Sequence, residues 1–238
     1  MTSNVVDLVL QAPARNALST ALMEDIRAQV RAAAGRPILL TGTDGAFSAG
    51  LNLKEVVALE RDGMERFLQL LEATMTELYC YPGPVVAAIG GHAIAGGCVL
   101  ALCCDHRVAL DDPKLLIGLN EVAIGLQFPP QLFTIVRRRV APRSLERVVL
   151  EAGLYDPRTA LALGLIDEVA TDPLTVARAH LDRLAAHPAA AFTATKRTLR
   201  GSTIPVSAAE QQWFRDELVP AWCAPAVKQL LTARLARR

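Results

Sequence analysis

The feature that constrains the fold of this chain most is an alternation of short apolar runs with longer segments of helical periodicity. In the segment of about residues 63–79, apolar side chains recur every three or four positions, which is typical of an amphipathic helix. Five short runs are strand candidates: residues 5–10, 37–41, 85–89, 106–110 and 114–119. Strands that alternate with helices in this way predict an α/β domain.

The second half of the chain has a different sequence pattern. From residue 130 onward the pattern is almost wholly helical, with one last short strand at residues 166–169. Asp156 and Asp172 each precede a proline, the arrangement of a helix cap followed by proline at the first helical position. Gly164 follows an apolar helical run and is expected to end that helix. The chain therefore combines an α/β portion with a helical C-terminal portion.

Composition and charge exclude several classes of function. At 238 residues the chain is long enough to bury the core of one large domain. Its 25 Lys and Arg nearly balance its 24 Asp and Glu, so neither nucleic acid nor an anionic membrane surface is indicated as a partner. No apolar stretch reaches membrane-spanning length, and no secretory signal is evident at the start. We therefore expect a soluble, cytoplasmic protein that binds neither nucleic acid nor membranes.

The sequence offers no pattern of metal ligands. Its cysteines show no metal-ligand spacing, and they read as small core residues of a reducing compartment: Cys80, Cys98, Cys103, Cys104 and Cys223. The spacing of acidic residues and histidines suggests no metal site either. We therefore expect no bound metal.

Two glycine-bearing loops have the same position between a predicted strand and a predicted helix. Residues 48–55 (SAGLNLKE) and 95–102 (AGGCVLAL) each follow a buried strand and run into a helix. A helix start offers unpaired N–H groups and the positive end of the helix dipole, and glycine lets a ligand approach that backbone closely. Two such groups converging on one carbonyl oxygen would stabilise the negative charge of an enolate. The alternative is that the glycines serve only tight packing of helix against strand.

Several segments, taken in order, resemble the successive signatures of one family. They are residues 13–19 (PARNALS), 40–55, 91–109, 117–125 (IGLNEVAIG) and 160–169 (ALALGLIDEV). They are similar to the signatures of the enoyl-CoA hydratase/isomerase, or crotonase, superfamily. The resemblance implies a crotonase-like spiral of β-β-α units over residues 1–188 and a helical C-terminal region over residues 189–238.

The resemblance also implies a homotrimer or a dimer of trimers. Aromatic residues of the C-terminal helices, Trp213, Phe214 and Trp222, lie on apolar faces that need a partner surface. Packing within the chain is the alternative explanation for these side chains.

The same resemblance assigns roles to individual residues. The peptide N–H groups of Leu51 and Gly96 would form the oxyanion hole for a thioester oxygen. The substrate would be an acyl-CoA thioester, and no separate cofactor is expected because CoA is part of that substrate. Where the family commonly carries an acid, this chain has Asn52, which weakens a role for that side chain. The implied contacts with CoA are Arg15, Ala17, Ala49 and Leu53.

The carboxylates decide which reaction the sequence favours. Hydratases of the superfamily place two glutamates along the acyl chain; the first of these positions falls on Val99 here and the second on Glu121. Adding water needs two positioned carboxylates, whereas moving a double bond from position 3 to position 2 needs a single base that carries the proton. The resemblance is therefore strongest to the Δ3,Δ2-enoyl-CoA isomerases, which serve fatty acid β-oxidation. Phe128, Pro129 and Pro130, where hydratases are typically glycine-rich, agree with this.

Other hypotheses remain open. Apolar neighbours of Glu121 in the sequence favour a pocket that raises its pKa, but an exposed loop carboxylate is the alternative. The protein could also be a hydratase, or another crotonase-type lyase, that recruits a carboxylate from elsewhere. A third hypothesis is an acyl-CoA-binding protein that has kept the fold and lost catalysis.

Overall fold

Two parallel sheets form the framework of the molecule. The computed structural model describes residues 5–43 and 45–236. The larger sheet has the strand order β1 (Val6–Leu10), β2 (Ile38–Gly42), β4 (Val85–Ile89), β6 (His106–Leu110) and β8 (Glu168–Ala170). The smaller sheet has the order β3 (Ala46–Ser48), β5 (His92–Ile94) and β7 (Ile117–Gly118). Every strand pair within both sheets is parallel.

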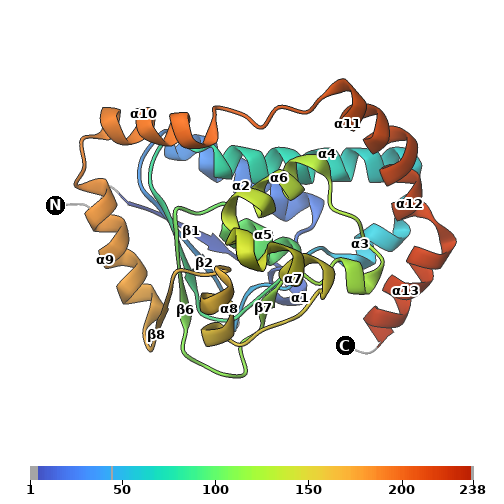
Figure 1. The fold of residues 1–238 in the computed structure, drawn as a ribbon, viewed down its shortest axis with the longest axis horizontal. Helices are drawn as coiled ribbons and strands as arrows, with labels where there is room; N and C mark the ends of the chain where they lie inside the picture. Colours follow the sequence, from blue (N-terminus) through green and yellow to red (C-terminus); the bar gives the residue numbers. More distant parts are fainter. Residues whose placement is uncertain (1–4, 44, 237–238) are drawn as a thin grey trace.

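The chain winds through the two sheets as a spiral (Figure 1). Three successive turns, β2 with β3, β4 with β5 and β6 with β7, each give one strand to the larger sheet and the next to the smaller sheet. Helices complete the turns: α3 (Leu53–Ala58) and α4 (Arg61–Tyr79), α5 (Gly96–Leu102), and α6 (Pro130–Arg139). The expected α/β class and the spiral of β-β-α units are confirmed.

Helices cover both faces of the larger sheet. On one face, α2 (Thr20–Ala33) and α4 bury apolar side chains in the main core, and the hydroxyl of Ser19 accepts from the Leu22 amide to begin α2. On the other face lies α9 (Pro173–Ala185), whose Ala177 and Leu181 join a second cluster with Val108 of β6. Burial of these apolar stripes is the main stabilising contribution to the fold.

The remaining elements are short. A 3-10 turn, η1 (Val122–Ile124), follows β7. The 3-10 turn η2 (Pro142–Ser144), α7 (Leu145–Leu150) and α8 (Pro157–Leu163) lead from α6 to the edge strand β8. The expected caps are present, since Asp156 and Asp172 accept from backbone amides at the starts of α8 and α9. Gly164 ends α8 with a φ of 78°.

Two expectations about strands were wrong in extent. The predicted strand at residues 114–119 shrinks to the two residues of β7, because the side chain of Asp112 accepts from the Lys114 amide and bends the chain into a turn. Conversely, β3 is not among the predicted strands, and it ends at Ser48, the first residue of the predicted glycine-bearing loop. Strands of three residues are too short to show a period of two in the sequence.

The helical C-terminal region packs against the rest of the chain. It begins with α10 (Ala189–Arg200), so the proposed boundary at residue 188 falls between two helices. Four more elements, α11 (Ala208–Trp213), the π-helical turn η3 (Phe214–Leu218), α12 (Val219–Cys223) and α13 (Pro225–Ala236), descend along one end of the molecule (Figure 1). Among the described residues, no helix is both long and apolar enough to cross a membrane.

The aromatic residues of this region find their partners within the chain. Phe214 and Trp222 are buried in the main core, and Trp213 packs partly against it. The intrachain alternative therefore holds for these three side chains. In α10 the buried residues are Lys196 and Arg200, whereas Leu199 is 76% exposed.

Candidate active site

The candidate site gathers where the three strands of the smaller sheet end. Parallel strands bring their carboxyl ends to one edge of a sheet, and a ligand in such a fold binds at that edge. The chain after β3 carries Leu51, the chain after β5 carries Gly96, and the chain after β7 carries Glu121. All three line one pocket. Strand order alone thus brings together three residues spread over more than a quarter of the sequence.

The two glycine-bearing loops press against each other. A Cβ added at Gly97 would lie 2.3 Å from the carbonyl oxygen of Ser48, and one added at Gly50 would lie 2.8 Å from that of Ile94. The packing explanation is therefore correct for these two glycines. It does not exclude the other explanation for Gly96, whose added Cβ would approach only the flexible side chains of Leu18 and Leu51, at 3.1 and 3.4 Å.

The backbone around Leu51 leaves its amide unused. The Leu18 amide donates to Gly50 O at 2.8 Å, and the Asn52 amide donates to Leu18 O at 3.0 Å. In this parallel pairing the intervening Leu51 N–H points away from Leu18. Gly96 is the first residue of α5, where a helix leaves its N–H groups without an internal partner. Within the described chain, no hydrogen-bond acceptor is found for either of the two amides.

A strained backbone turn holds the Gly96 amide in place. Ala95 has a φ of 51° and a ψ of −123°, a conformation that normally requires glycine. Such a residue costs about 1–3 kcal/mol and persists only where its surroundings fix it. Here the Ala95 amide donates to Gly118 O at 2.8 Å, and its carbonyl accepts from Val99 at 3.0 Å. The structure thus fixes the turn that presents Gly96.

A second segment with unusual backbone angles holds the first glycine-bearing loop. Ala14, Arg15 and Asn16 have consecutive positive φ angles of 58°, 61° and 56°. The buried Asn16 side chain donates to the carbonyl oxygens of Thr43 and Ala46, at 3.1 and 3.0 Å. It also accepts from the Ala12 amide at 3.0 Å. This left-handed turn (Pro13–Asn16, α1) is thereby attached to the strand that precedes Leu51.

Glu121 is buried at the same pocket. Its side chain is 7% exposed, so the exposed-carboxylate alternative is wrong. Its carbonyl accepts from Ile124 and Leu126, and Gly125, with a φ of 78°, closes this turn. Desolvation by burial raises the pKa of Glu121 to about 8. Its Oε2 atom is buried without a hydrogen-bond partner among the described residues, which leaves it free for a ligand.

The pocket includes some of the expected CoA contacts and omits others. Ala49 and Leu53 line it. Arg15 is exposed and Ala17 is buried, and neither lies in the lining. Arg15 acts on the first loop through its carbonyl oxygen, which accepts from the Ala49 amide at 3.0 Å. Asn52 caps α3, since its side chain accepts from the Glu55 amide at 3.4 Å.

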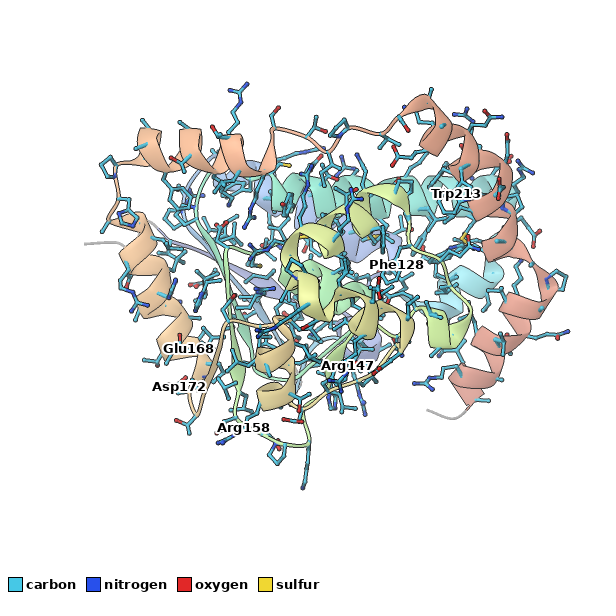
Figure 2. The ribbon with its side chains drawn as sticks, in the orientation of Figure 1. Phe128, Arg147, Arg158, Glu168, Asp172 and Trp213 are labelled. Atoms are coloured by element: carbon cyan, nitrogen blue, oxygen red, sulfur yellow. The ribbon has the colours of Figure 1, made fainter. Side chains whose placement is uncertain are left out.

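Several lining residues were not predicted, most of them because distant elements supply them. They include Leu71 of α4, Leu132 of α6, Trp222 of α12 and Arg234 of α13, together with Asn120 and Gln127 near Glu121. Figure 2 shows Phe128, also in the lining, between the central helices and the column of C-terminal helices. Trp222 is fixed there by its indole N–H, which donates to Gln127 O at 3.2 Å. No short-range pattern links α12 or α13 to the loops they cover.

A crotonase-type spiral that brings a buried carboxyl group and two free amides to one pocket defines a class of protein that can move a proton and stabilise an oxyanion there. The model of the enoyl-CoA hydratase/isomerase family matches residues 1–218. The chain therefore belongs to the enoyl-CoA hydratase/isomerase family.

Individual relatives include both isomerases and hydratases. The chain is 34% identical to enoyl-CoA delta isomerase 1 of Mus musculus over 168 residues, which cover 70% of this chain and 58% of that protein. The match to the human counterpart covers 44% of its length, so the chain spans about half the length of these curated relatives. A Mycobacterium tuberculosis protein named "Probable enoyl-CoA hydratase EchA14" is 33% identical over 202 residues, covering 81% of this chain and 76% of that protein.

Among solved structures, the human mitochondrial delta3-delta2-enoyl-CoA isomerase resembles this chain over nearly its full length. The TM-score is 0.85 at 27% sequence identity, with 99% of this chain and 94% of that chain covered. The fold is therefore that of the family throughout.

Proposed function

We propose that this protein is a Δ3,Δ2-enoyl-CoA isomerase, which moves a double bond in an acyl-CoA thioester. The observation that carries the proposal is the pocket lining: among its described residues, Glu121 supplies the single carboxylate, and it shares the pocket with Leu51 and Gly96. A base, a place for a proton and two amides for an oxyanion are the groups that this reaction requires.

In the proposed reaction one carboxyl group acts twice, first as the base and then as the acid. The substrate's thioester oxygen accepts from the Leu51 and Gly96 amides, and the ionised carboxylate of Glu121 takes a proton from C2. The negative charge spreads over the resulting dienolate and its oxygen, where the two amides stabilise it. The carboxylic acid of Glu121 then returns the proton at C4, which leaves the double bond between C2 and C3. A pKa of about 8 suits a group that must both accept and release a proton near neutral pH.

The position of Val99 supports isomerisation over hydration. Val99 lies fully buried within α5 and contributes nothing to the lining of the pocket. A hydratase needs a second carboxylate to hold and activate water, and the described lining offers none. The similarity to curated isomerases agrees with this choice.

A direct comparison of two reactions tests the proposal. Purified protein is assayed with a 3-enoyl-CoA, with formation of the 2-enoyl-CoA measured by a coupled assay, and with crotonyl-CoA for hydration. Glu121→Gln should lower the isomerisation rate about 10²- to 10⁴-fold, because the base is lost while the shape is kept. The matched control is Glu151→Gln, since Glu151 is exposed.

The outcomes separate the candidate functions. No turnover of the 3-enoyl-CoA by the wild type, or full turnover by Glu121→Gln, would exclude the proposed isomerase. Hydration of crotonyl-CoA faster than isomerisation would favour a hydratase. Binding of CoA thioesters without any reaction would favour an acyl-CoA-binding protein.

The proposal extends to assembly, location and role. We propose a homotrimer or a dimer of trimers that acts in the cytoplasm in fatty acid β-oxidation, with no cofactor besides the CoA of its substrate. The exposed Leu199 on α10 supports a subunit contact at that helix.

A further inference from the structure

A second cluster of chemically capable side chains lies on the face of the larger sheet that α9 covers. His106 begins β6, Glu168 begins β8 and His180 lies on α9. The register pairs Val108 with Glu168, so the side chains of His106 and Glu168 emerge on the same face of neighbouring strands. One ligand atom from each of the three residues lies within 4.8 Å of the other two. Parallel pairing and helix packing thus assemble three metal-binding groups from distant parts of the sequence.

Neighbouring groups orient these ligands. Nε2 of His106 lies 3.4 Å from Oε2 of Glu168, and its Nδ1 lies 3.9 Å from Oδ2 of Asp167. Asp167 is itself held by Arg107, whose guanidinium donates two hydrogen bonds of 2.7 Å. A carboxylate behind the second nitrogen of a histidine is the usual support of a metal-binding imidazole. His106 is therefore oriented with one nitrogen toward Glu168 and the other toward Asp167.

The two imidazoles are adjacent and available. The rings of His106 and His180 stack with centroids 3.5 Å apart and 4° between their planes. The side chains of His106 and Glu168 are 18% and 43% exposed, so water can complete a coordination shell.

We propose that His106, Glu168 and His180 bind a zinc ion, with solvent as the remaining ligand. Two imidazoles and one carboxylate are a donor set that Zn²⁺ favours, in tetrahedral geometry at about 2.0–2.2 Å. Because the two stacked rings hold their lone pairs in parallel planes, at least one imidazole must rotate for both to bind the same ion. Such an ion would connect β6, the edge strand β8 and α9, and so stabilise this end of the molecule.

This candidate zinc site is separate from the pocket. None of its three residues lines that pocket. Figure 2 shows Glu168 beside α9, well away from Phe128 of the pocket. The zinc proposal therefore stands or falls independently of the isomerase proposal.

One neighbour opposes binding and gives a sharp test. Arg183 is exposed, and its Nη2 lies 2.6 Å from Nδ1 of His180. Donation by Arg183 to Nδ1 places the proton of neutral His180 on Nε2, and the guanidinium repels a second cation. Arg183 must rotate into solvent for the metal to bind through Nε2. Its replacement by glutamine should therefore strengthen zinc binding.

The test is a titration of the metal-free protein, without a histidine tag, with ZnCl₂ in a calorimeter. Co²⁺ serves as a spectroscopic probe, because a tetrahedral site gives it strong visible absorption. We expect one Zn²⁺ per chain, with affinity at least about tenfold weaker in His106→Ala, His180→Ala and Glu168→Gln, and stronger in Arg183→Gln. The control is His187→Ala, since His187 is an exposed histidine outside the cluster.

Failure of the zinc proposal is equally measurable. Absence of saturable Zn²⁺ binding in the wild type, unchanged affinity in the three ligand variants, or equal loss in His187→Ala would overturn it. A gain of affinity in Arg183→Gln cannot arise from misfolding, so this variant keeps the test valid if a ligand variant folds poorly. Circular dichroism of each variant monitors its folding.

Discussion

At the scale of single residues, the carboxyl group of Glu121 is held where its charged form is disfavoured. The folded protein keeps its pKa at about 8, whereas the ordinary value is 4.5. Between these pH values, the folded protein retains a proton that the unfolded chain has released. The free energy of unfolding therefore falls as the pH rises through this range.

Glu121→Gln should accordingly stabilise the protein, whatever it does to the proposed isomerase activity. Glutamine carries no charge, so we expect the variant to exceed the wild type by roughly 1–3 kcal/mol in free energy of unfolding at pH 8.5. At pH 4.5 the two proteins should be nearly equal, because the wild-type carboxyl group is then protonated when folded. Urea unfolding from pH 4.5 to 8.5 measures the difference. A constant difference across this range would contradict the burial of Glu121.

The sequence predicts some of these residues and misses others for a physical reason. The resemblance of the motifs that contain Leu51, Gly96 and Glu121 predicted them as site residues, and all three line one pocket. Arg15 lies in an equally recognisable segment but is exposed and outside the lining of the pocket, so its contact with CoA stays a prediction. His106 and His180 carry no signal in their spacing, because sheet register and helix packing bring them together.

At the scale of elements, buried ion pairs attach α10 to the rest of the molecule. The carboxylate of Asp105 lies 2.7 Å from Nζ of Lys196 and 2.8 Å from Nη2 of Arg200. These two cationic side chains are 6% and 8% exposed. Arg200 also donates to the carbonyl oxygens of Tyr79 and Cys103, near the C-terminal ends of α4 and α5. Cations at such ends are favourable, because the helix dipole is negative there.

Asp105→Asn should therefore be strongly destabilising. It leaves two buried cations without a counter-charge, and we expect a loss of about 3–5 kcal/mol in free energy of unfolding. The matched control is Asp7→Asn, which breaks an exposed ion pair with Arg178 and should change stability by less than about 1 kcal/mol. Urea unfolding of both variants at one pH gives the comparison. Equal losses of free energy of unfolding in the two variants would contradict the expectation that the buried ion pairs of Asp105 contribute more than the exposed ion pair of Asp7.

The sequence predicted the long elements far better than the short ones. The helix expected at residues 63–79 is α4, which begins two residues earlier, and the runs at residues 5–10, 37–41 and 85–89 are β1, β2 and β4. Most of the smaller sheet was missed, because its strands have two or three residues and depend on their neighbours for pairing. The helices of the C-terminal region were predicted, but α10 presents Lys196 to the core and Leu199 to solvent.

At the scale of the whole molecule, the C-terminal region is part of the main core. Phe214, Leu218, Trp222 and Leu231 belong to the same apolar cluster as the residues of the two sheets. A region that shares its core with the rest of the chain unfolds together with it.

The two tryptophans make this cooperativity measurable. Trp213 and Trp222 are the only tryptophans of the sequence, so tryptophan fluorescence reports on the C-terminal helices alone, while far-ultraviolet circular dichroism reports on all helices. We expect the two urea unfolding curves to coincide at a fixed protein concentration. A fluorescence transition at lower urea would instead show that residues 189–238 unfold first.

The contribution of Trp222 and Arg234 to the pocket also orders events during synthesis. The loops that present Leu51, Gly96 and Glu121 leave the ribosome well before α12 and α13, which supply the last wall. A nascent chain that ends before residue 222 therefore holds an apolar cavity open to water, a kind of surface that chaperones bind. A chain truncated before residue 222 should therefore lack part of the pocket wall and be prone to aggregation.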